Sequence, residues 1–347
     1  MRFFKTLSHF VHRNFIWLVC GSYVVAACFP GLGLAIRSAS IGGMSLPMIM
    51  LAALLFNAGV GVDVKALAHL RKEPLLLLLG LAGNVLIPLA FIGAVTMLMG
   101  LWHNPDEVQN ILVGLALVAS MPIAGSSTAW SQNANGNMTL SLGLVLGSTL
   151  LSPLLTPLVL HAVGFMTTGD YSQDLHELAG GQTGSFLLVA VILPSLLGIA
   201  FRQCVGTARA TSFKSSLKLA NSALLLVLNY SNASVSLPHA IANPDYDLLG
   251  VILVIVSGLC VIAFLAGYSI WRLRRSHKAD KVALMFGLGM NNNGTGLVLA
   301  SLALADHPRV LLPIIFYNLV QHLIAGIIDH MMFRKGEEEA VALAEAS

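Results

Sequence analysis

The stretch GLGMNNNGTG, Gly287 to Gly296, lies inside a long apolar segment, with VALMF before it and LVLA after it. Glycine and asparagine are both poor helix formers. Inside a lipid bilayer a broken helix also leaves backbone N–H and C=O groups that water cannot reach, so that protein or a ligand must satisfy them. The stretch therefore predicts a membrane helix that is interrupted at a functional site.

The composition of the whole chain is typical of a membrane protein. Of the 347 residues, 56% are hydrophobic and 10% are charged, and the mean hydropathy is +0.81. An ordinary soluble chain carries about 25% charged residues. One membrane span needs roughly 20 apolar residues. Ten candidate segments are present, at 15–36, 44–62, 75–100, 109–131, 138–163, 185–201, 218–240, 248–271, 282–305 and 310–333.

These segments predict an all-α polytopic membrane protein with ten transmembrane helices. They form a single transmembrane domain over 15–333, preceded by an interfacial segment, 1–14, and followed by an acidic cytoplasmic tail, 334–347. The connections around 164–184 and 202–217 are expected to be polar loops, which leaves no room for a soluble domain.

The basic residues predict the orientation of the chain. If the N-terminus is inside, every Lys and Arg except Arg37 and Arg309 falls on the inner side of the membrane. Basic residues near span ends are retained in the cytoplasm. A missed span would invert all later loops and destroy this asymmetry. We therefore expect both termini in the cytoplasm, at the cell membrane (the inner membrane in a bacterium), and the net charge of +3 indicates orientation, not a nucleic-acid partner.

A second interruption lies at the matching place in the first half of the chain, within SMPIAGSSTAWSQNANGN, residues 120–137. It falls in the fourth segment, and GLGMNNNGTG falls in the ninth, which is the fourth of the second five. Because five is odd, the two halves have opposite orientation, as an inverted repeat requires. Substrate sites in many transporters lie where such broken helices meet. We expect repeats at about 15–163 and 185–333, with broken helices four and nine crossing near the midplane.

The residues at the two breaks are candidates for binding a substrate or a cation. Three adjacent asparagines on an intact helix would point about 100° apart in turn, so at least one would face an unsuitable environment. In the first break, hydroxyl groups accompany Pro122 and Gly125. The candidate residues are Ser126, Ser127, Thr128, Met290, Asn291, Asn292 and Asn293.

Two polar residues outside the breaks leave two interpretations open. Asn84, in the third segment, either contacts the ligand or forms a hydrogen bond between helices. His322, in the tenth segment, is the only ionisable side chain expected near mid-depth. It is either a proton-binding residue or a neutral imidazole that bonds between helices. Glycines such as Gly125 can also serve only to pack helices closely.

Both interrupted segments resemble the bile acid:sodium symporter family. The stretch PIAGSSTAWSQNANGNMTLSLGLVLGSTLLSPLLTP, residues 122–157, is similar to the fourth-to-fifth span region of that family, and GLGMNNNGTGLVLA is similar to its ninth-span motif. His322 followed by Gly326 fits its tenth-span pattern. The resemblance implies five-plus-five inverted repeats, crossed fourth and ninth helices, and sodium-coupled symport of an organic anion by alternating access.

The resemblance also implies a sodium site, and this chain departs from it. The implied Na⁺ ligands are Ser127, Thr128, Ser141, Asn291 and Asn292, with Asn84 corresponding to a third-span glutamine of the family. The carboxylate that the family places between its sodium sites falls on Gly287, and a threonine falls on Val145. Asn, Ser and Thr oxygens can bind Na⁺ but supply no negative charge. A proton-coupled or uncoupled carrier of the same fold therefore stays open.

No enzyme motif is visible in the chain. It contains no HExxH, no paired intramembrane aspartates, no nucleotide-binding loop and no metal spacing among its four cysteines. We expect a transporter that is not an enzyme and has no cofactor, with Na⁺ as a possible coupling ion. A channel or a sensor is the remaining alternative. The expected partners are a small organic anion and the lipid bilayer, while substrate identity, stoichiometry and oligomeric state stay open.

Overall fold

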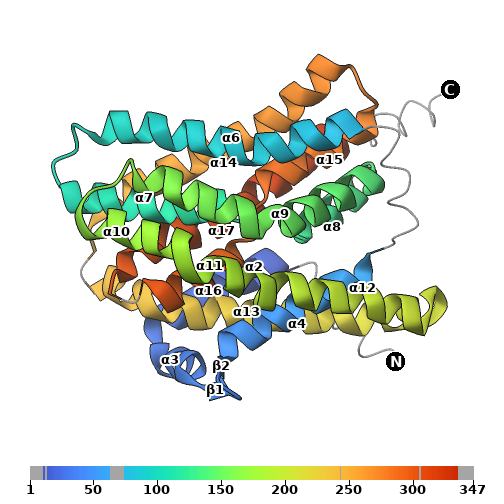
Figure 1. Ribbon diagram of the computed structural model, residues 1–347, viewed down its shortest axis with the longest axis horizontal. Helices are drawn as coiled ribbons and strands as arrows, with labels where there is room; N and C mark the ends of the chain where they lie inside the picture. The colour runs from blue at the N-terminus through green and yellow to red at the C-terminus, as the bar shows by residue number, and fades with distance from the viewer. Residues whose placement is uncertain (1–10, 12–13, 63–73, 243, 305, 335–347) are drawn as a thin grey trace.

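The computed structural model describes residues 11, 14–62, 74–242, 244–304 and 306–334, and almost all of these are helical (Figure 1). The predicted interfacial segment and acidic tail lie outside the described residues, apart from Val11, Asn14 and Arg334. The predicted all-α class is confirmed for the described part of the chain.

The helices follow the predicted apolar segments in order. The elements are α2 (Phe15–Cys28), α3 (Pro30–Ser38), β1 (Ser40–Ile41), β2 (Met44–Ser45), α4 (Leu46–Gly61), α6 (Pro74–Met99), α7 (Pro105–Ser120), α8 (Ser126–Asn133), α9 (Met138–Gly164), α10 (Gly169–Glu177), the π-helix η2 (Leu178–Gln182), α11 (Thr183–Leu187), the π-helix η3 (Leu188–Ile192), α12 (Leu193–Val205), α13 (Thr207–Ala242), α14 (Tyr246–Arg274), α15 (Lys278–Gly289), α16 (Asn293–Ala303), the 3₁₀-helix η4 (Pro308–Val310), α17 (Leu311–Ile328) and the π-helix η5 (Asp329–Arg334). Strands β1 and β2 form a small antiparallel ladder between α3 and α4.

Several described helices are long and apolar enough to cross a membrane. Five stretches qualify by length and composition, and a sixth is added if α2 and α3 count as one bent span. The five are Pro74–Met99, Met138–Gly164, Thr183–Val205, Tyr246–Arg274 and Pro308–Met332. The chain is therefore a multi-pass helical membrane protein. The count of ten spans and the inverted repeat stay predictions.

The first predicted span, 15–36, is wrong as a single helix. The chain turns by 93° between α2 and α3, at Phe29. Pro30 begins α3, and a proline has no N–H to continue the preceding helix. Its ring also disfavours the helical conformation for the residue before it, which is Phe29. The apolar composition of the segment concealed this bend.

The two predicted polar loops are largely helical as well. The loop at 164–184 contains α10, which has Asp170 in its first turn and His176 in its last, an arrangement that favours a helix. The loop at 202–217 is reduced to Gly206, because α12 ends at Val205 and α13 begins at Thr207. Gly206 has φ +84°, in the left-handed region that favours glycine.

The helices pack as two groups, which we call the small and the large bundle. In the small bundle, α4 packs along α12, and α13 packs against α2, α3 and α4. In the large bundle, α14 packs against α6, α15 and α17, and α9 packs against α6, α7 and α8. In Figure 1, α3, α4, α12 and α13 lie along one side of the molecule and α6 and α14 along the other. The bundles meet where α4 and α13 reach α16, and where α2 and α13 reach α17.

A buried carboxylate joins the starts of α9 and α15 in the large bundle. Asp280 is 2% exposed, and it accepts hydrogen bonds from Asn137 Nδ2 at 2.7 Å and from His277 N at 3.1 Å. The backbone N–H of Asn137 donates to Ala279 O at 2.8 Å. These bonds hold together two helix starts that are far apart in the sequence.

We predict that Asp280→Ala lowers the melting temperature in detergent by several degrees. The change removes the carboxylate that accepts from the partly buried Nδ2 of Asn137 and from His277 N, a loss of about 2 kcal/mol. The exposed Asp306 provides a control, because Asp306→Ala should melt within one or two degrees of the parent. Equal melting temperatures for the two variants would contradict the structural role of Asp280.

Candidate functional site

The two broken helices meet at their breaks. The break between α7 and α8 and the break between α15 and α16 form an antiparallel bridge, in which Ile123 pairs with Asn291. Ala124 N donates to Met290 O at 2.9 Å, and Asn292 N donates to Pro122 O at 2.8 Å. Each break therefore satisfies backbone groups that the other break leaves free, as an apolar environment requires.

Asn291 fixes this crossing with its side chain as well as its backbone. Its Nδ2 donates to Val118 O at 3.0 Å, and its backbone N donates to Gln321 Oε1 at 3.0 Å. Gln321 Nε2 in turn donates to Asn291 O at 3.3 Å. Asn291 Oδ1 is buried and has no hydrogen-bond partner among the described residues. One atom of the predicted ligand-binding amide is thus left for a ligand.

The other two asparagines begin α16. Asn292 Oδ1 accepts from Thr295 N at 3.3 Å, so Asn292 is the N-cap of the helix. Asn293 is 1% exposed, and neither atom of its amide has a partner within the described chain. The Oγ1 of Thr295 is also buried and has no hydrogen-bond partner among the described residues. Most buried polar groups have a partner. The first turn of α16 therefore presents polar atoms that a ligand or a water molecule can satisfy.

The hydroxyl groups of the first break have different surroundings. Ser126 begins α8 and is partly exposed. Thr128 Oγ1 donates to Gly125 O at 2.7 Å, within its own helix turn. Ser127 is fully buried, and its Oγ has no partner among the described residues. Of these three predicted residues, only Ser127 shares with Asn293 a buried side-chain atom that has no partner among the described residues.

A leucine lies beside Gly287, the position on which the resemblance places the family's carboxylate. A Cβ atom built on Gly287 would lie 2.9 Å from Leu144 Cδ1. Leu144 belongs to a buried apolar cluster with Leu140 and Leu284. The Oγ of Ser141, one turn before Leu144 on α9, donates to Ser131 Oγ at 3.3 Å. Gly287 is therefore a close-packing residue, and apolar atoms fill the space beside it.

Asn84 and His322 belong to two other helices, α6 and α17. Asn84 is buried, its Oδ1 has no partner within the described chain, and it lines a cavity of about 10 Å³ beside Pro122. Ser148 and Ser152 also line this cavity, which has room for about one water molecule. His322 follows Gln321 on α17 and is partly buried.

A chain of amides that the sequence did not single out leads away from Asn291. Gln321 Nε2 lies 3.4 Å from Asn318 Oδ1. Asn318 Nδ2 donates to the hydroxyl of Tyr23 at 2.8 Å and to Asn229 Oδ1 at 3.5 Å. The chain connects the crossing in the large bundle to α2 and α13 in the small bundle. The sequence feature that could have indicated this chain is the pair Asn318 and Gln321, two amides three positions apart in an apolar helix.

The small bundle adds unpaired polar atoms of its own. Asn232 on α13 is fully buried with neither side-chain atom paired, and Ser236 Oγ is unpaired among the described residues. Leu228, one turn before Asn232, approaches α16, because a Cβ on Gly294 would lie 3.8 Å from Leu228 Cδ2. Residues four apart share a helix face, so Asn232 and Ser236 continue the face that α13 turns toward α16.

We call this contact region the α13–α16 seam. The two helices carry unpaired polar residues near this contact, Asn232 and Ser236 on α13 and Asn293 and Thr295 on α16. The seam lies where the small and large bundles meet, next to the crossing, and it combines amide donors with amide and hydroxyl acceptors. The arrangement fits a polar or anionic ligand held between the bundles.

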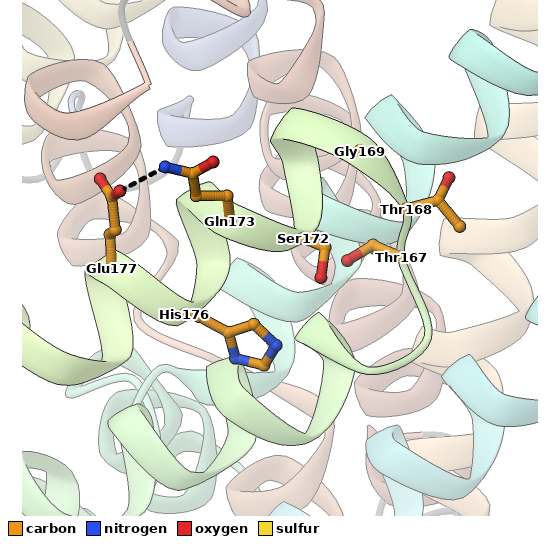
Figure 2. A pocket seen from close by; sticks show the side chains of 7 residues that line it. All are labelled: Thr167, Thr168, Gly169, Ser172, Gln173, His176 and Glu177. Atoms are coloured by element: carbon orange, nitrogen blue, oxygen red, sulfur yellow. Dashed lines mark hydrogen bonds between the residues drawn. The ribbon is translucent and has the colours of Figure 1, made fainter.

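An open hollow elsewhere has no connection to the crossing. It lies at the turn between α9 and α10, and Figure 2 shows the side chains that line it. Gln173 Nε2 donates to Glu177 Oε1 at 2.9 Å, and His176 Nδ1 lies 2.8 Å from His161 Nδ1. All lining residues fall within 167–177, so neither break contributes to this hollow.

The described residues include no cluster of three or more His, Cys, Asp and Glu that could hold a metal ion. The buried carboxylates that are described, Glu107, Asp280 and Asp329, lie at helix ends. The crossing thus contains oxygen and nitrogen ligands but no described carboxylate.

Comparison with known proteins agrees with the motifs at the first break. The model of a family described as the Sodium Bile acid symporter family matches residues 48–240, which is more than half of the chain. The uncharacterized protein YbaS of Bacillus subtilis (strain 168) is 26% identical over 280 residues, covering 80% of this chain and 86% of that protein. The family match includes Asn84, Ser127 and Asn232.

We predict that Asn232→Leu leaves the melting temperature of the ligand-free protein unchanged or raises it. The change removes two buried polar atoms that have no partner, so nothing is lost in the folded state. Asn318→Leu is the matched control, because it breaks the bonds to Tyr23 and Asn229 and should cost about 1–3 kcal/mol. If Asn232→Leu were destabilised as much as Asn318→Leu, Asn232 would be a structural residue.

Proposed function

Because the chain belongs to the Sodium Bile acid symporter family, we propose that it is a secondary transporter of a small organic anion. The unpaired polar atoms of the α13–α16 seam are the observation that supports this most directly. Buried amide N–H groups at Asn232 and Asn293 can donate to oxygen atoms of such a ligand. The absence of a described carboxylate there removes a source of repulsion.

The proposed mechanism is alternating access, in which one bundle moves relative to the other. The crossing ties α7, α8, α15 and α16 together by backbone hydrogen bonds, so these elements move as part of one body. The seam lies between that body and the small bundle, and movement there would open the site to one side of the membrane at a time. We propose ten spans in two inverted repeats for this arrangement, with both termini in the cytoplasm and the protein in the cell membrane.

Sodium is the proposed coupling ion, since it is part of the family's description. Ser127 Oγ and Asn291 Oδ1 are buried and unpaired in the described structure, and oxygen atoms of this kind suit a hard cation. Three further predicted ligands already make hydrogen bonds, since Thr128 donates within α8, Ser141 donates to Ser131 and Asn292 caps α16, and each of these oxygens keeps a lone pair for a cation. The transported anion would then supply the negative charge that Gly287 lacks.

A second candidate is a carrier of the same anion that needs no sodium. The specific observation in its favour is Leu144, whose side chain fills the space where the family's carboxylate would stand. A cation without a counter-charge is costly to bury. Proton coupling or uncoupled transport would remove this cost, and His322 is then the residue to test for proton binding.

The function is tested by uptake into proteoliposomes of labelled taurocholate, pyruvate and pantoate. We expect saturable uptake of at least one anion that is stimulated by the same anion inside the vesicle. Asn232→Leu should reduce that uptake at least ten-fold, whereas Ser269→Ala, an exposed position on α14, should stay within two-fold. Uptake that rises linearly with concentration would indicate a channel, and the absence of uptake of all three anions would contradict the proposal.

The coupling ion is tested by comparing sodium, potassium and choline buffers, with the anion transported by the parent. Sodium coupling predicts that Na⁺ alone barely shifts the melting temperature, whereas Na⁺ and the anion together raise it, because each ligand binds more tightly when the other is present. Gly287→Glu combined with Leu144→Ala supplies a carboxylate and the space for it. That double variant should be stabilised by Na⁺ without the anion, and Leu144→Ala alone is its control.

Equal uptake and equal melting temperatures of the parent in the three buffers would rule out sodium coupling. The second candidate would then be measured directly, as uptake driven by a proton gradient, with His322→Ala as the comparison. Loss of gradient-driven uptake in that variant would identify proton coupling, and unchanged uptake would leave the uncoupled carrier.

A further inference from the structure

Arg37 connects the two bundles at one end of the seam. It lies in the last turn of α3, in the small bundle, and its Nη2 donates to the backbone oxygen of Ser301 on α16, in the large bundle. Its other terminal nitrogen, Nη1, is buried and has no hydrogen-bond partner among the described residues. One side of the guanidinium therefore contacts the large bundle, while the other side has a donor available.

The charge of Arg37 has no described counter-ion. Histidines pair with Glu107, Asp174 and Asp247, and no ion pair of Arg37 is present among the described residues. A guanidinium stays protonated in proteins, so Arg37 cannot lose its charge to reduce the cost of burial. A partly buried cation without an anion is unfavourable. An anion that binds beside Nη1 would remove this cost.

Arg37 also lies at the junction of the helices that form the seam. Gly33, one turn before Arg37, packs on α13, where its N–H donates to the hydroxyl of Tyr230 at 3.1 Å and where a Cβ would overlap Ser234. Ser301 lies about two turns beyond Asn293 on α16. Helices α3, α13 and α16 therefore converge near Arg37, and the unpaired amide of Asn293 lies about two turns away along α16.

We infer that Arg37 binds the negatively charged group of the transported anion at the end of the α13–α16 seam. The inference rests on the proposed function and identifies the chemistry of its substrate, a carboxylate or a sulfonate. Such a group can accept from Nη1 in the plane of the guanidinium while Nη2 keeps its bond to Ser301. The sequence pattern agrees, because Arg37 is one of only two basic residues expected on the outer side.

A purely structural role would account for half of these contacts. Arginine side chains can bond to the last carbonyl groups of a helix, and Ser301 is in the last turn of α16. A cap of this kind explains Nη2, but it leaves Nη1 buried and unpaired and the charge uncompensated. The two roles differ in what happens to the affinity for a charged ligand compared with a neutral one of the same shape.

The test compares an anion with its uncharged ester in the full-length protein. Cholate and methyl cholate compete with labelled taurocholate uptake in proteoliposomes, or pyruvate and methyl pyruvate compete with labelled pyruvate if that is the anion transported. In Arg37→Gln we expect the inhibition constant of the anion to rise at least ten-fold and that of the ester to change less than two-fold. Arg309→Gln, at the other basic residue expected outside, is the matched control and should change neither constant more than two-fold.

The inference is overturned if Arg37→Gln binds the anion as the parent does, or if the anion and the ester weaken equally, which is the result for a structural cap. If Arg37→Gln does not fold, the same two inhibition constants, of the anion and of its ester, are measured in Arg37→Lys. Lysine keeps the positive charge but lacks the planar pair of donors. A rise for the anion alone supports the inference, and an equal rise for both ligands overturns it. If the parent transports none of the tested anions, the proposed function fails and the inference fails with it. If the parent transports an anion but Arg37→Gln binds that anion normally, only the inference about Arg37 fails.

Discussion

Every peptide group inside a bilayer must find its hydrogen-bond partner within the protein, and this requirement organises the crossing. Two helices break here, and the breaks pair with each other through Ala124, Met290, Pro122 and Asn292. The side chain of Asn291 then bonds to the carbonyl of Val118 at the end of α7. Because each break depends on the other, the two broken helices have one stable relative position, and the polar atoms around them are held in place.

Much of the fold could be predicted from the sequence, because apolar length and helix breakers are local properties. The ten apolar segments all contain helix, and the breaks near Pro122 and Asn291 lie where glycine, proline and asparagine gather. The bend at Phe29 was missed although Pro30 stands in the sequence, because a proline in an apolar segment can also begin a helix or merely kink it. The helix α10 was missed because a short polar segment can be either a loop or a surface helix.

The site was predicted less completely, because it depends on which helices become neighbours. Asn291, Asn293 and Ser127 were singled out from the sequence because they stand at a break, and Asn84 because it is an amide in an apolar segment; binding by these residues stays a prediction. The polar face of α13 was not singled out, since serines and asparagines in a membrane helix more often pack helices together. The role of Leu144 was also hidden: the sequence reports that Gly287 has no side chain, but only the fold determines which neighbour fills the vacant space.

The hydrogen bonds of Asn318 have a consequence for the rate of transport. This amide joins α17 to Tyr23 on α2 and to Asn229 on α13, so it spans the boundary between the bundles. For a protein that works by the proposed alternating access, each reorientation has to exchange these bonds for others. The exchange costs little where water can replace the lost partners and several times more where it cannot. Turnover would then be limited by how quickly water enters that boundary, so two relatives with equal affinity for an anion could differ greatly in rate through the hydration of this single amide.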